Sequence, residues 1–282
     1  MSVKIIVDSA ADFLPETAAR VKCVDMVVRF GDKEYIDGVE LSAYDFYGLL
    51  TASEELPTTS QITPYAYETV FEEVLKEYDE AVCITLSSGL SGTYQSALIA
   101  AENFHGKICV VDSLNATIGI GVLAEAALNL VDMGMTAGEI AQRLDVLRTK
   151  VRVMGAIDTL EYLKRGGRIS PTVAFAGGLL NIKPVIKVTD VGTLELAGKA
   201  RGTKASHAML SKLIREEGEI DFSMPLLLAY SGQDGGVLDT YLEANGDLWA
   251  PYGKELPRTV VGSIVGTHIG PGGVAVAYFL KN

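Results

Sequence analysis

Residues 81–97 of the chain read AVCITLSSGLSGTYQSA, and three patterns follow one another within this stretch. The apolar run Ala81–Leu86 predicts a buried β-strand, and Thr93–Phe104 has the spacing of an α-helix. The loop between them is rich in serine and glycine. Such a loop before a helix presents backbone N–H groups and the positive end of the helix dipole to an anion, so a carboxylate or a phosphate is the expected guest. A structural role, with Ser91 as a helix N-cap, fits the spacing equally well.

The same alternation of apolar runs and helical patterns continues on both sides of this stretch. In the first half, strands are predicted at Val3–Val7, Val24–Phe30, Lys107–Val111 and Val151–Ile157, and helices at Ser42–Thr51, Pro64–Tyr78, Asn115–Val131 and from Thr136 to about Lys150. In the second half, helices are predicted at Pro171–Leu180, Lys204–Glu216 and Gly235–Ala244, and strands at Lys183–Val188, Thr193–Lys199, Leu226–Tyr230, Thr259–Ile264 and Val274–Leu280. This alternation predicts an α/β fold in which helices cover a parallel sheet, with a domain boundary near residue 155.

Composition excludes several classes of protein. The chain has 282 residues, of which 48% are hydrophobic, so it can bury a large core. Its formal net charge of -12 disfavours nucleic-acid binding, because an acidic protein repels phosphodiester backbones. Cys23, Cys83 and Cys109 lie among apolar neighbours, which is typical of buried thiols in a reducing compartment and predicts a cytoplasmic protein. The run Lys4–Asp8 is too short for a signal-peptide core, and acidic residues interrupt the longest weakly polar stretch, so no membrane span is expected.

Three more loops carry side chains suited to an anionic ligand. The hydroxyl cluster Pro57–Pro64 precedes a helix, and its alternative role is helix capping. In Leu160–Ser170, three cations flank two glycines; the first two suit a helix C-terminus, whereas Arg168 lies beyond the glycines and is the better candidate for the ligand. His268 lies in the glycine-rich segment Gly266–Gly273, which is predicted to be a loop between two late strands.

Other motifs are interpreted as structural or are missing. Gly119–Ala124 fits the dinucleotide-binding string, but it lies inside a predicted helix, so its glycines are interpreted as positions of close helix packing. The sequence has no Walker-type phosphate loop and no nucleophile elbow. Without a second histidine at ligand spacing, no metal site is predicted.

In this order along the chain, the motifs resemble those of the DegV family, the fatty-acid-binding subunits of bacterial fatty acid kinase. The resemblance rests on VDSAAD (7–12), TSQ (59–61), SSGLSGTY (87–94), VDS (111–113), LKRGGRI (163–169), LNIKP (180–184) and HIGPG (268–272). It implies a two-domain α/β protein, with an N-terminal parallel-sheet domain over 1–155 and a C-terminal α/β domain with a mixed sheet over 156–282. Residues 21–57 are compatible with packing on either domain. One long-chain fatty acid is expected between the domains, in an apolar pocket. The apolar, small-residue stretch Thr172–Leu180 is compatible both with lining that pocket and with forming an interdomain core helix.

The resemblance also implies roles for individual residues. Thr59 and Ser91 are expected to hold the carboxylate. The full set of expected ligand-binding residues is Thr59, Ser60, Ser91, Gly92, Thr93 and His268. Arg168, His268 and Asp37 are expected to support phosphoryl transfer.

In the family, the bound acid is presented to a separate ATP-dependent kinase protein and leaves as an acyl phosphate. The chain is therefore expected to be a carrier with fatty acid as its ligand and with no cofactor, metal or catalytic residue of its own. Arg201, in the basic segment Lys199–Lys204, is a candidate for docking the kinase, and an ordinary solvated turn is its alternative. The competing functions are a self-sufficient phosphotransferase or serine hydrolase that uses Ser91 and His268, and a ligand-responsive binding module. Transient contact with a membrane is compatible with the carrier.

Overall fold

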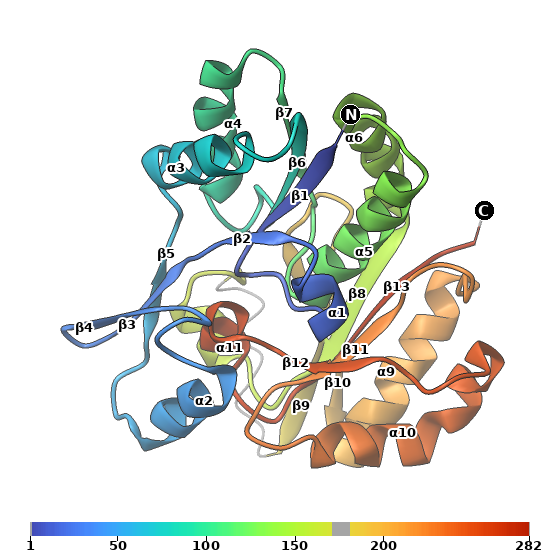
Figure 1. Ribbon diagram of the computed structural model, residues 1–282. Coiled ribbons are helices and arrows are strands. Elements are labelled where there is room, and N and C mark those ends of the chain that lie inside the picture. The colour runs from blue at the N-terminus through green and yellow to red at the C-terminus, as the bar shows by residue number, and fades with distance from the viewer. Residues whose placement is uncertain (1, 171–180, 282) are drawn as a thin grey trace.

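The computed structural model describes residues 2–170 and 181–281, and the strands of this part of the chain form three sheets (Figure 1). The helix predicted at Pro171–Leu180, with the pocket-lining stretch inside it, lies outside the described residues.

The first sheet is parallel and has the strand order β2-β1-β6-β7. Its strands are β1 (Val3–Asp8), β2 (Lys22–Val24), β6 (Glu80–Thr85) and β7 (Ile108–Asp112). The helices that accompany it are α3 (Pro64–Val74), α4 (Thr93–Ala101), α5 (Ile118–Asp132) and α6 (Ala137–Leu147). β6 is buried over almost its whole length, as expected for a parallel strand covered on both faces. The parallel sheet predicted for the first half is confirmed.

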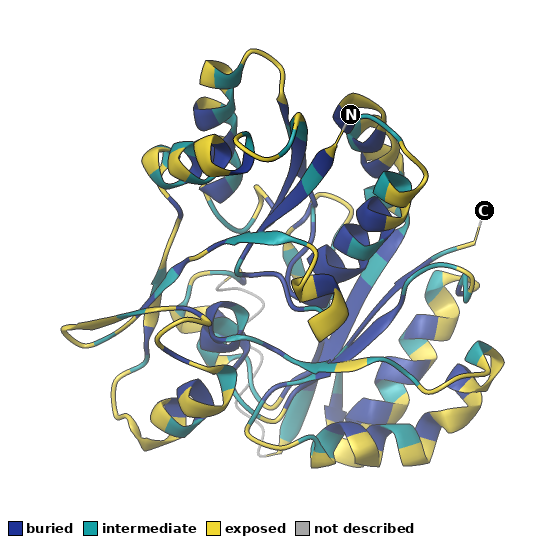
Figure 2. Cartoon of the chain, in the orientation of Figure 1, coloured by how far each residue is buried: buried dark blue, intermediate teal, exposed yellow. Residues whose placement is uncertain are grey.

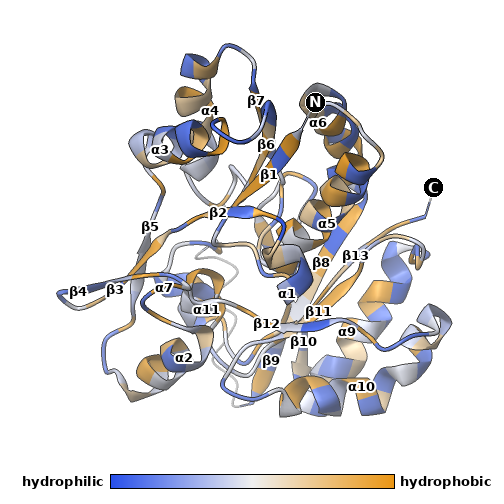
Figure 3. Cartoon of the chain, viewed as in Figure 1, coloured by the Kyte–Doolittle hydropathy of each residue, from blue (hydrophilic) through white to orange (hydrophobic). Residues whose placement is uncertain are grey.

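The second sheet is mixed, with the order β10-β9-β8-β13-β11-β12. Its strands are β8 (Val151–Ala156), β9 (Ile182–Val188), β10 (Leu194–Arg201), β11 (Leu227–Tyr230), β12 (Arg258–Val260) and β13 (Val274–Phe279). Among its strand pairs only β11 and β12 run parallel. The helices α9 (Thr203–Glu217) and α10 (Gly236–Trp249) pack on it. Both turn a polar face outward, and β8, β11 and β13 behind them are mostly apolar and largely buried (Figures 2 and 3).

β8 already belongs to the mixed sheet, so the change of sheet falls before Val151. The expected boundary near residue 155 would leave most of β8 in the first domain. The division into 1–155 and 156–282 stays a prediction.

Residues 21–57 contribute to two sheets. β2 joins the parallel sheet, whereas β3 (Val27–Phe30) and β4 (Lys33–Ile36) form a small antiparallel sheet with β5 (Thr58–Ser60). The single strand predicted at Val24–Phe30 is therefore wrong. Met26 interrupts it, because its backbone N–H donates to Ser9 Oγ and its carbonyl accepts from the backbone of Asp37. The predicted helix near Ser42 is confirmed as α2 (Ala43–Ala52), which Ser42 caps.

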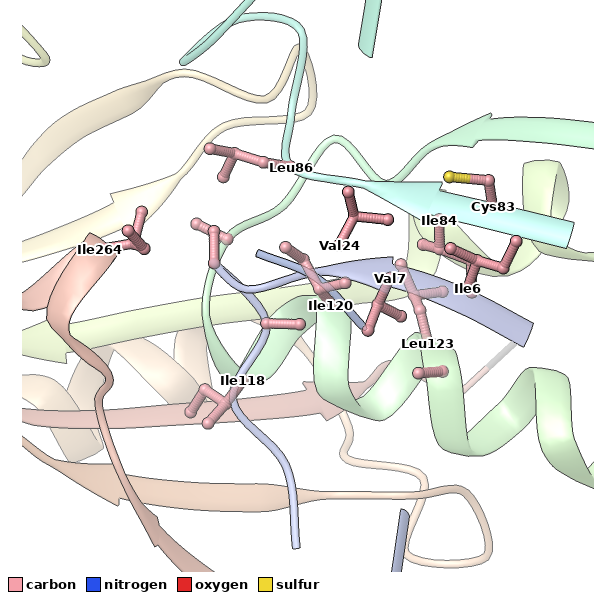
Figure 4. Packing of buried hydrophobic residues seen from close by; sticks show 14 of the residues in the cluster. Ile6, Val7, Val24, Cys83, Ile84, Leu86, Ile118, Ile120, Leu123 and Ile264 are labelled. Atoms are coloured by element: carbon pink, nitrogen blue, oxygen red, sulfur yellow. The ribbon is translucent and has the colours of Figure 1, made fainter. Parts of the chain in front are cut away.

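α5 is the shared element of the two large sheets, since it contacts β1 and β6 on one side and β8, β11 and β13 on the other. Two glycines make this close packing feasible. A Cβ on Gly119 would lie 2.5 Å from Val153 Cγ2, and one on Gly121 would lie 2.1 Å from the backbone oxygen of Asp12. The packing interpretation of the dinucleotide-like string is confirmed. Figure 4 shows the apolar side of this contact, with side chains of α5 beside those of the parallel sheet, among them Ile118, Ile120, Leu123, Ile6 and Val7.

The segment that carries His268 is helical. It forms α11 (Ser263–Ile269), and His268 lies in its last turn. The predicted loop and the predicted strand to Ile264 are therefore wrong, since β12 ends at Val260. Gly270 ends the helix with a φ of 72°, and a Cβ there would lie 2.3 Å from the ring of Tyr162, so the close approach and the left-handed backbone both require glycine. The remaining short helices are α1 (Pro15–Ala18), α7 (Glu161–Arg165), η1 (Glu102–Phe104), η2 (Arg148–Lys150) and η3 (Ala250–Tyr252).

Candidate ligand cavity

A cavity of about 280 Å³ lies where the loops after β5 and β6 meet α7 and α11. Its polar lining side chains come from Thr59, Ser60, Gln61, Ser91, Arg168 and His268. The remaining lining residues are Met26, Leu86, Leu90, Gly92, Ala116, Leu163, Leu194, Ile264, Val265 and Ile269. Four segments that are distant in sequence thus bring hydroxyl, amide, guanidinium and imidazole groups to one apolar cavity.

The serine- and glycine-rich loop reaches this cavity from the carboxyl end of β6. Ser91 Oγ lies 2.9 Å from Thr93 Oγ1 and accepts the backbone N–H of Thr93 at 3.2 Å. Gly92 follows Ser91 as the N-cap residue of α4 and is packed against the side chain of Gln61, since a Cβ on Gly92 would lie 2.2 Å from Gln61 Oε1. The first turn of α4 therefore points its N–H groups toward the hydroxyls, which suits an anion.

Thr59 and His268 meet in the cavity, although they are 209 residues apart in sequence. Thr59 Oγ1 and His268 Nε2 are 3.0 Å apart and share a hydrogen bond. Gly166 packs against the opposite side of the imidazole, where a Cβ would lie 2.3 Å from His268 Nδ1. Burial, together with the nearby positive charge of Arg168, lowers the pKa of His268 to about 4. His268 is therefore neutral at physiological pH, and one of its ring nitrogens can accept a proton or a hydrogen bond.

Arg168 lies between the two glycine-rich loops. Its Nε donates to the carbonyl of Leu90 at 3.4 Å, and its Nη1 donates to the carbonyl of Gly166 at 2.5 Å. Both partners are neutral carbonyls, so these bonds leave the guanidinium with its full charge. The cation is thus held beside the serine loop, where it can stabilise a carboxylate or a phosphoryl group.

A second, mostly apolar cavity of about 50 Å³ adjoins the first. Ala116, Leu194, Val265 and Ile269 line both cavities. The second one continues between α11, β8, β9 and β13, with Val153, Ile186 and Val274 among its walls. Polar groups thus cluster at one end of the combined space, and apolar side chains line the other.

The expected site residues separate into two groups. Thr59, Ser60, Ser91, Gly92, Arg168 and His268 all line the first cavity. Thr93 is buried and supports that loop, because its Oγ1 shares a hydrogen bond with Ser91 Oγ and accepts the backbone N–H of Ile62 at 3.4 Å.

Asp37 and Arg201 lie outside that lining. Asp37 is buried at the start of α11, where its carboxylate accepts the hydroxyl of Ser263, and burial raises its pKa. It therefore holds the first residue of α11, the helix that carries His268 near its other end. Arg201 is exposed at the end of β10, next to Gly202.

Sequence reasoning missed most of the apolar lining. Leu86 and Leu90 flank the serine loop and could have been included because that loop was already a candidate. Leu194, Ile264 and Val265 carried no such signal, because they enter the cavity from β10 and α11 through tertiary packing. Gln61 stands next to the hydroxyls in sequence, and its contact with Gly92 was not foreseen.

The pairing of Ser91 with His268 that a serine hydrolase would use is not the arrangement observed. His268 Nε2 bonds to Thr59, and Ser91 Oγ bonds to Thr93. Within residues 2–170 and 181–281, no group of three or more histidine, cysteine or acidic side chains is arranged to hold a metal ion. In the same ranges, no helix combines the length and the apolar character needed to cross a bilayer.

Fold and cavity together define an α/β protein with a ligand cavity where elements of a parallel sheet and a mixed sheet meet. The chain belongs to the DegV family: the family model, described as "Uncharacterised protein, DegV family", matches residues 2–281. A DegV domain-containing protein of Deinococcus radiodurans is 32% identical, with 98% of each chain covered.

Solved structures share the fold. A DegV family protein from Thermus thermophilus for which fatty acid binding is described has 30% identity and a TM-score of 0.88, with all of both chains covered. The fatty acid kinase (Fak) B3 protein of Streptococcus pneumoniae, loaded with linoleic acid, has 24% identity and a TM-score of 0.86, again over all of both chains. The expected two-part α/β architecture, with one parallel and one mixed sheet, is confirmed.

Proposed function

We propose that this protein binds one long-chain fatty acid, with the carboxylate among Thr59, Ser91 and His268 and the acyl chain directed toward the second cavity. The observation that carries the proposal is the polarity of the combined space: hydroxyls, an imidazole and a guanidinium lie at one end, and apolar walls lie at the other. Fatty acid binding by the Thermus thermophilus protein supports the same assignment.

The energetics of such a ligand agree with this division. A chain of roughly sixteen carbons gains about 0.8 kcal/mol for each buried methylene group, which gives on the order of ten kcal/mol before ordering costs. The tail therefore supplies the affinity. An unpaired buried carboxylate would cost several kcal/mol, so the head group requires hydroxyls, helix N–H groups and a nearby cation.

The second part of the proposal is that the bound acid is presented to a separate ATP-dependent kinase, which converts it to an acyl phosphate. Arg168 and neutral His268 lie beside the expected carboxylate, where charge develops during phosphoryl transfer. Asp37 supports the step by holding the first turn of α11. In this proposal the protein acts in the cytoplasm, contacts membranes only transiently, and has fatty acid but no cofactor as its ligand.

Arg201 is proposed as a docking residue for the kinase. Arg201 is exposed on a chain whose net charge is -12. A positive side chain on such a surface attracts an acidic surface of a partner protein. Arg201→Glu should raise the kinase concentration needed for half-maximal rate without changing fatty acid affinity.

Ligand extraction tests the binding proposal directly. Protein purified from bacteria should release a long-chain fatty acid that mass spectrometry identifies, and delipidated protein should rebind oleate stoichiometrically. Absence of lipid in both measurements would overturn the carrier assignment. Acyl-phosphate formation with ATP, Mg²⁺ and no added kinase would favour the self-sufficient enzyme instead.

A further inference from the structure

The tripeptide Val-Asp-Ser occurs twice, at residues 7–9 and 111–113. The two copies end β1 and β7, which are the two strands that flank β6 in the parallel sheet. Both aspartates are buried. The serine-rich loop leaves β6 between them, so the repeated motif borders the loop that carries Ser91 on both sides.

Each aspartate accepts a backbone N–H of that loop. Leu86 N donates to Asp8 Oδ2 at 2.6 Å, and Ser88 N donates to Asp112 Oδ1 at 3.2 Å. Ser87 N, which lies between them, donates to the carbonyl of Asn115 at 2.9 Å. Three successive N–H groups are thus fixed, two by the aspartates at the flanking strand ends and one by the segment that follows β7.

These bonds determine where Ser91 lies. The carbonyl of Ser87 accepts the N–H of Leu90 at 3.0 Å and that of Ser91 at 3.1 Å, and Ser87 Oγ donates to the carbonyl of Gly192 at 2.7 Å. Ser87 is fully buried, so this connection is shielded from water. A shift of residues 86–88 would therefore move Ser91 and the first turn of α4 together.

We infer that Asp8 and Asp112 are positioning residues that clamp the head-group loop from both sides and so give the site its preference for a carboxylate. This inference rests on the proposed function. The two aspartates act through the position of their acceptor oxygens and not through their charge. In Asp112 a single oxygen, Oδ1, accepts both Ser88 N and Leu114 N, the latter at 3.0 Å, so an amide oxygen at the same place can serve both donors.

Three variants of Asp112 separate position from charge. Asp112→Asn keeps the acceptor and removes the charge, Asp112→Glu keeps the charge and displaces the acceptor, and Asp112→Ala removes both. The readout is the ratio of affinities for oleate and for oleyl alcohol, because the two ligands share a tail and differ in the head group. We expect the ratio to fall on the order of tenfold in the Glu and Ala variants and to stay near wild type in the Asn variant.

The matched control is Asp79→Ala. Asp79 also accepts a backbone N–H, from Ser2 at 2.7 Å, but it precedes β6 at the opposite end of the sheet. This variant should leave the ratio unchanged, which separates positioning from a general loss of stability. An unchanged ratio in the Glu and Ala variants, or an equal loss in the Asn variant, would overturn the clamp.

Amide hydrogen exchange tests the clamp without any ligand. The N–H groups of Ser88 and Ser91 should exchange at least about tenfold faster in the Glu variant than in the Asn variant, since only the latter keeps the acceptor in place. Equal protection in both would overturn the inference. Wild-type protein that binds neither oleate nor oleyl alcohol would refute the proposed function, and the exchange measurement would still decide the clamp.

Discussion

The two ends of the cavity are built by different kinds of contact. At the polar end, Thr59, Ser91 and Arg168 are fixed by hydrogen bonds to named partners, each with its own distance and direction. At the apolar end, the walls are apolar side chains of α11 and the mixed sheet, such as Val265, Val153 and Val274. A hydrogen bond is lost when its geometry changes slightly, whereas apolar contacts are non-directional and roughly additive in area.

This difference assigns different properties to the two ends. Changes at the polar end should alter selectivity for the head group and the rate of phosphoryl transfer. Changes at the apolar end should alter fatty acid affinity, and the effect should grow with the length of the acyl chain.

The largest effect is expected on phosphoryl transfer. Arg168→Ala and His268→Ala should slow acyl-phosphate formation by the kinase by about 10²–10³, because each removes a group that meets developing charge. Most of the oleate affinity should remain, since the tail supplies it. Rates with saturating kinase, compared with oleate titrations, measure the two effects separately. Equal losses in rate and affinity would show that the two residues serve binding alone.

The next effect concerns the passage between the cavities. Ala116 is buried and lines both, so Ala116→Leu should narrow the space that the acyl chain crosses. If roughly four methylene groups of the acyl chain are no longer buried, the binding free energy weakens by about 3 kcal/mol, which is on the order of a hundredfold in oleate affinity. Decanoate is the matched ligand control, since its shorter chain should bind as it does to wild type. A similar loss for both acids would place the passage elsewhere.

Removal of one head-group hydroxyl should have a smaller effect. Thr59→Ala and Ser91→Ala each remove a hydrogen bond to a charged group, worth about 1.5–3 kcal/mol, which is roughly ten- to a hundredfold in affinity. Thr63→Ala serves as control, because Thr63 caps α3 a few residues further on and should affect stability but not affinity. Isothermal titration with oleate measures all three. Unchanged affinity in folded Thr59 and Ser91 variants would mean that these hydroxyls do not hold the carboxylate.

The same division explains which parts of the molecule could be predicted from sequence. The serine loop was predictable because strand, loop and helix are contiguous there, and the local pattern determines all three. The glycines at 119 and 121 were interpretable for the same reason, since their place inside a helical pattern decided between packing and nucleotide binding.

Nonlocal features could not be predicted in this way. The bond between Thr59 and His268 joins residues 209 apart, and no local pattern encodes such a pairing. α11 was mistaken for a loop because glycines flank a helix of only seven residues, which is too short to display a periodic pattern. Leu194 lines the cavity because β10 pairs with β9 beside it, so its role depends on the sheet order.

The smallest predicted effect is on stability in acid and depends on the polar end alone. Burial and Arg168 lower the pKa of His268 to about 4, whereas in an unfolded chain it lies near 6.5. Between pH 6.5 and pH 4 the His268 imidazole is protonated in the unfolded chain but stays neutral in the folded protein. His268 therefore lowers the free energy of unfolding as the pH falls through this range. Asp8 and Asp12 act in the opposite direction: burial raises both pKa values to about 7, so the stability they contribute at low pH is lost as pH rises through that value.

His268→Gln isolates the histidine contribution from these opposing carboxylates. Glutamine can still bond to Thr59, and it does not titrate, so the variant should lose less stability than wild type between pH 7 and pH 4.5. The expected difference is on the order of 1–2 kcal/mol, less than the full linkage value because the imidazole is only partly buried. Urea unfolding of wild type and variant at both pH values gives four free energies of unfolding. The change with pH in the variant is subtracted from the change in wild type, and the carboxylate contributions cancel because both proteins share them. Parallel pH profiles for the two proteins would mean that the imidazole titrates alike in the folded and unfolded states, and the lowered pKa assigned to His268 would then be wrong.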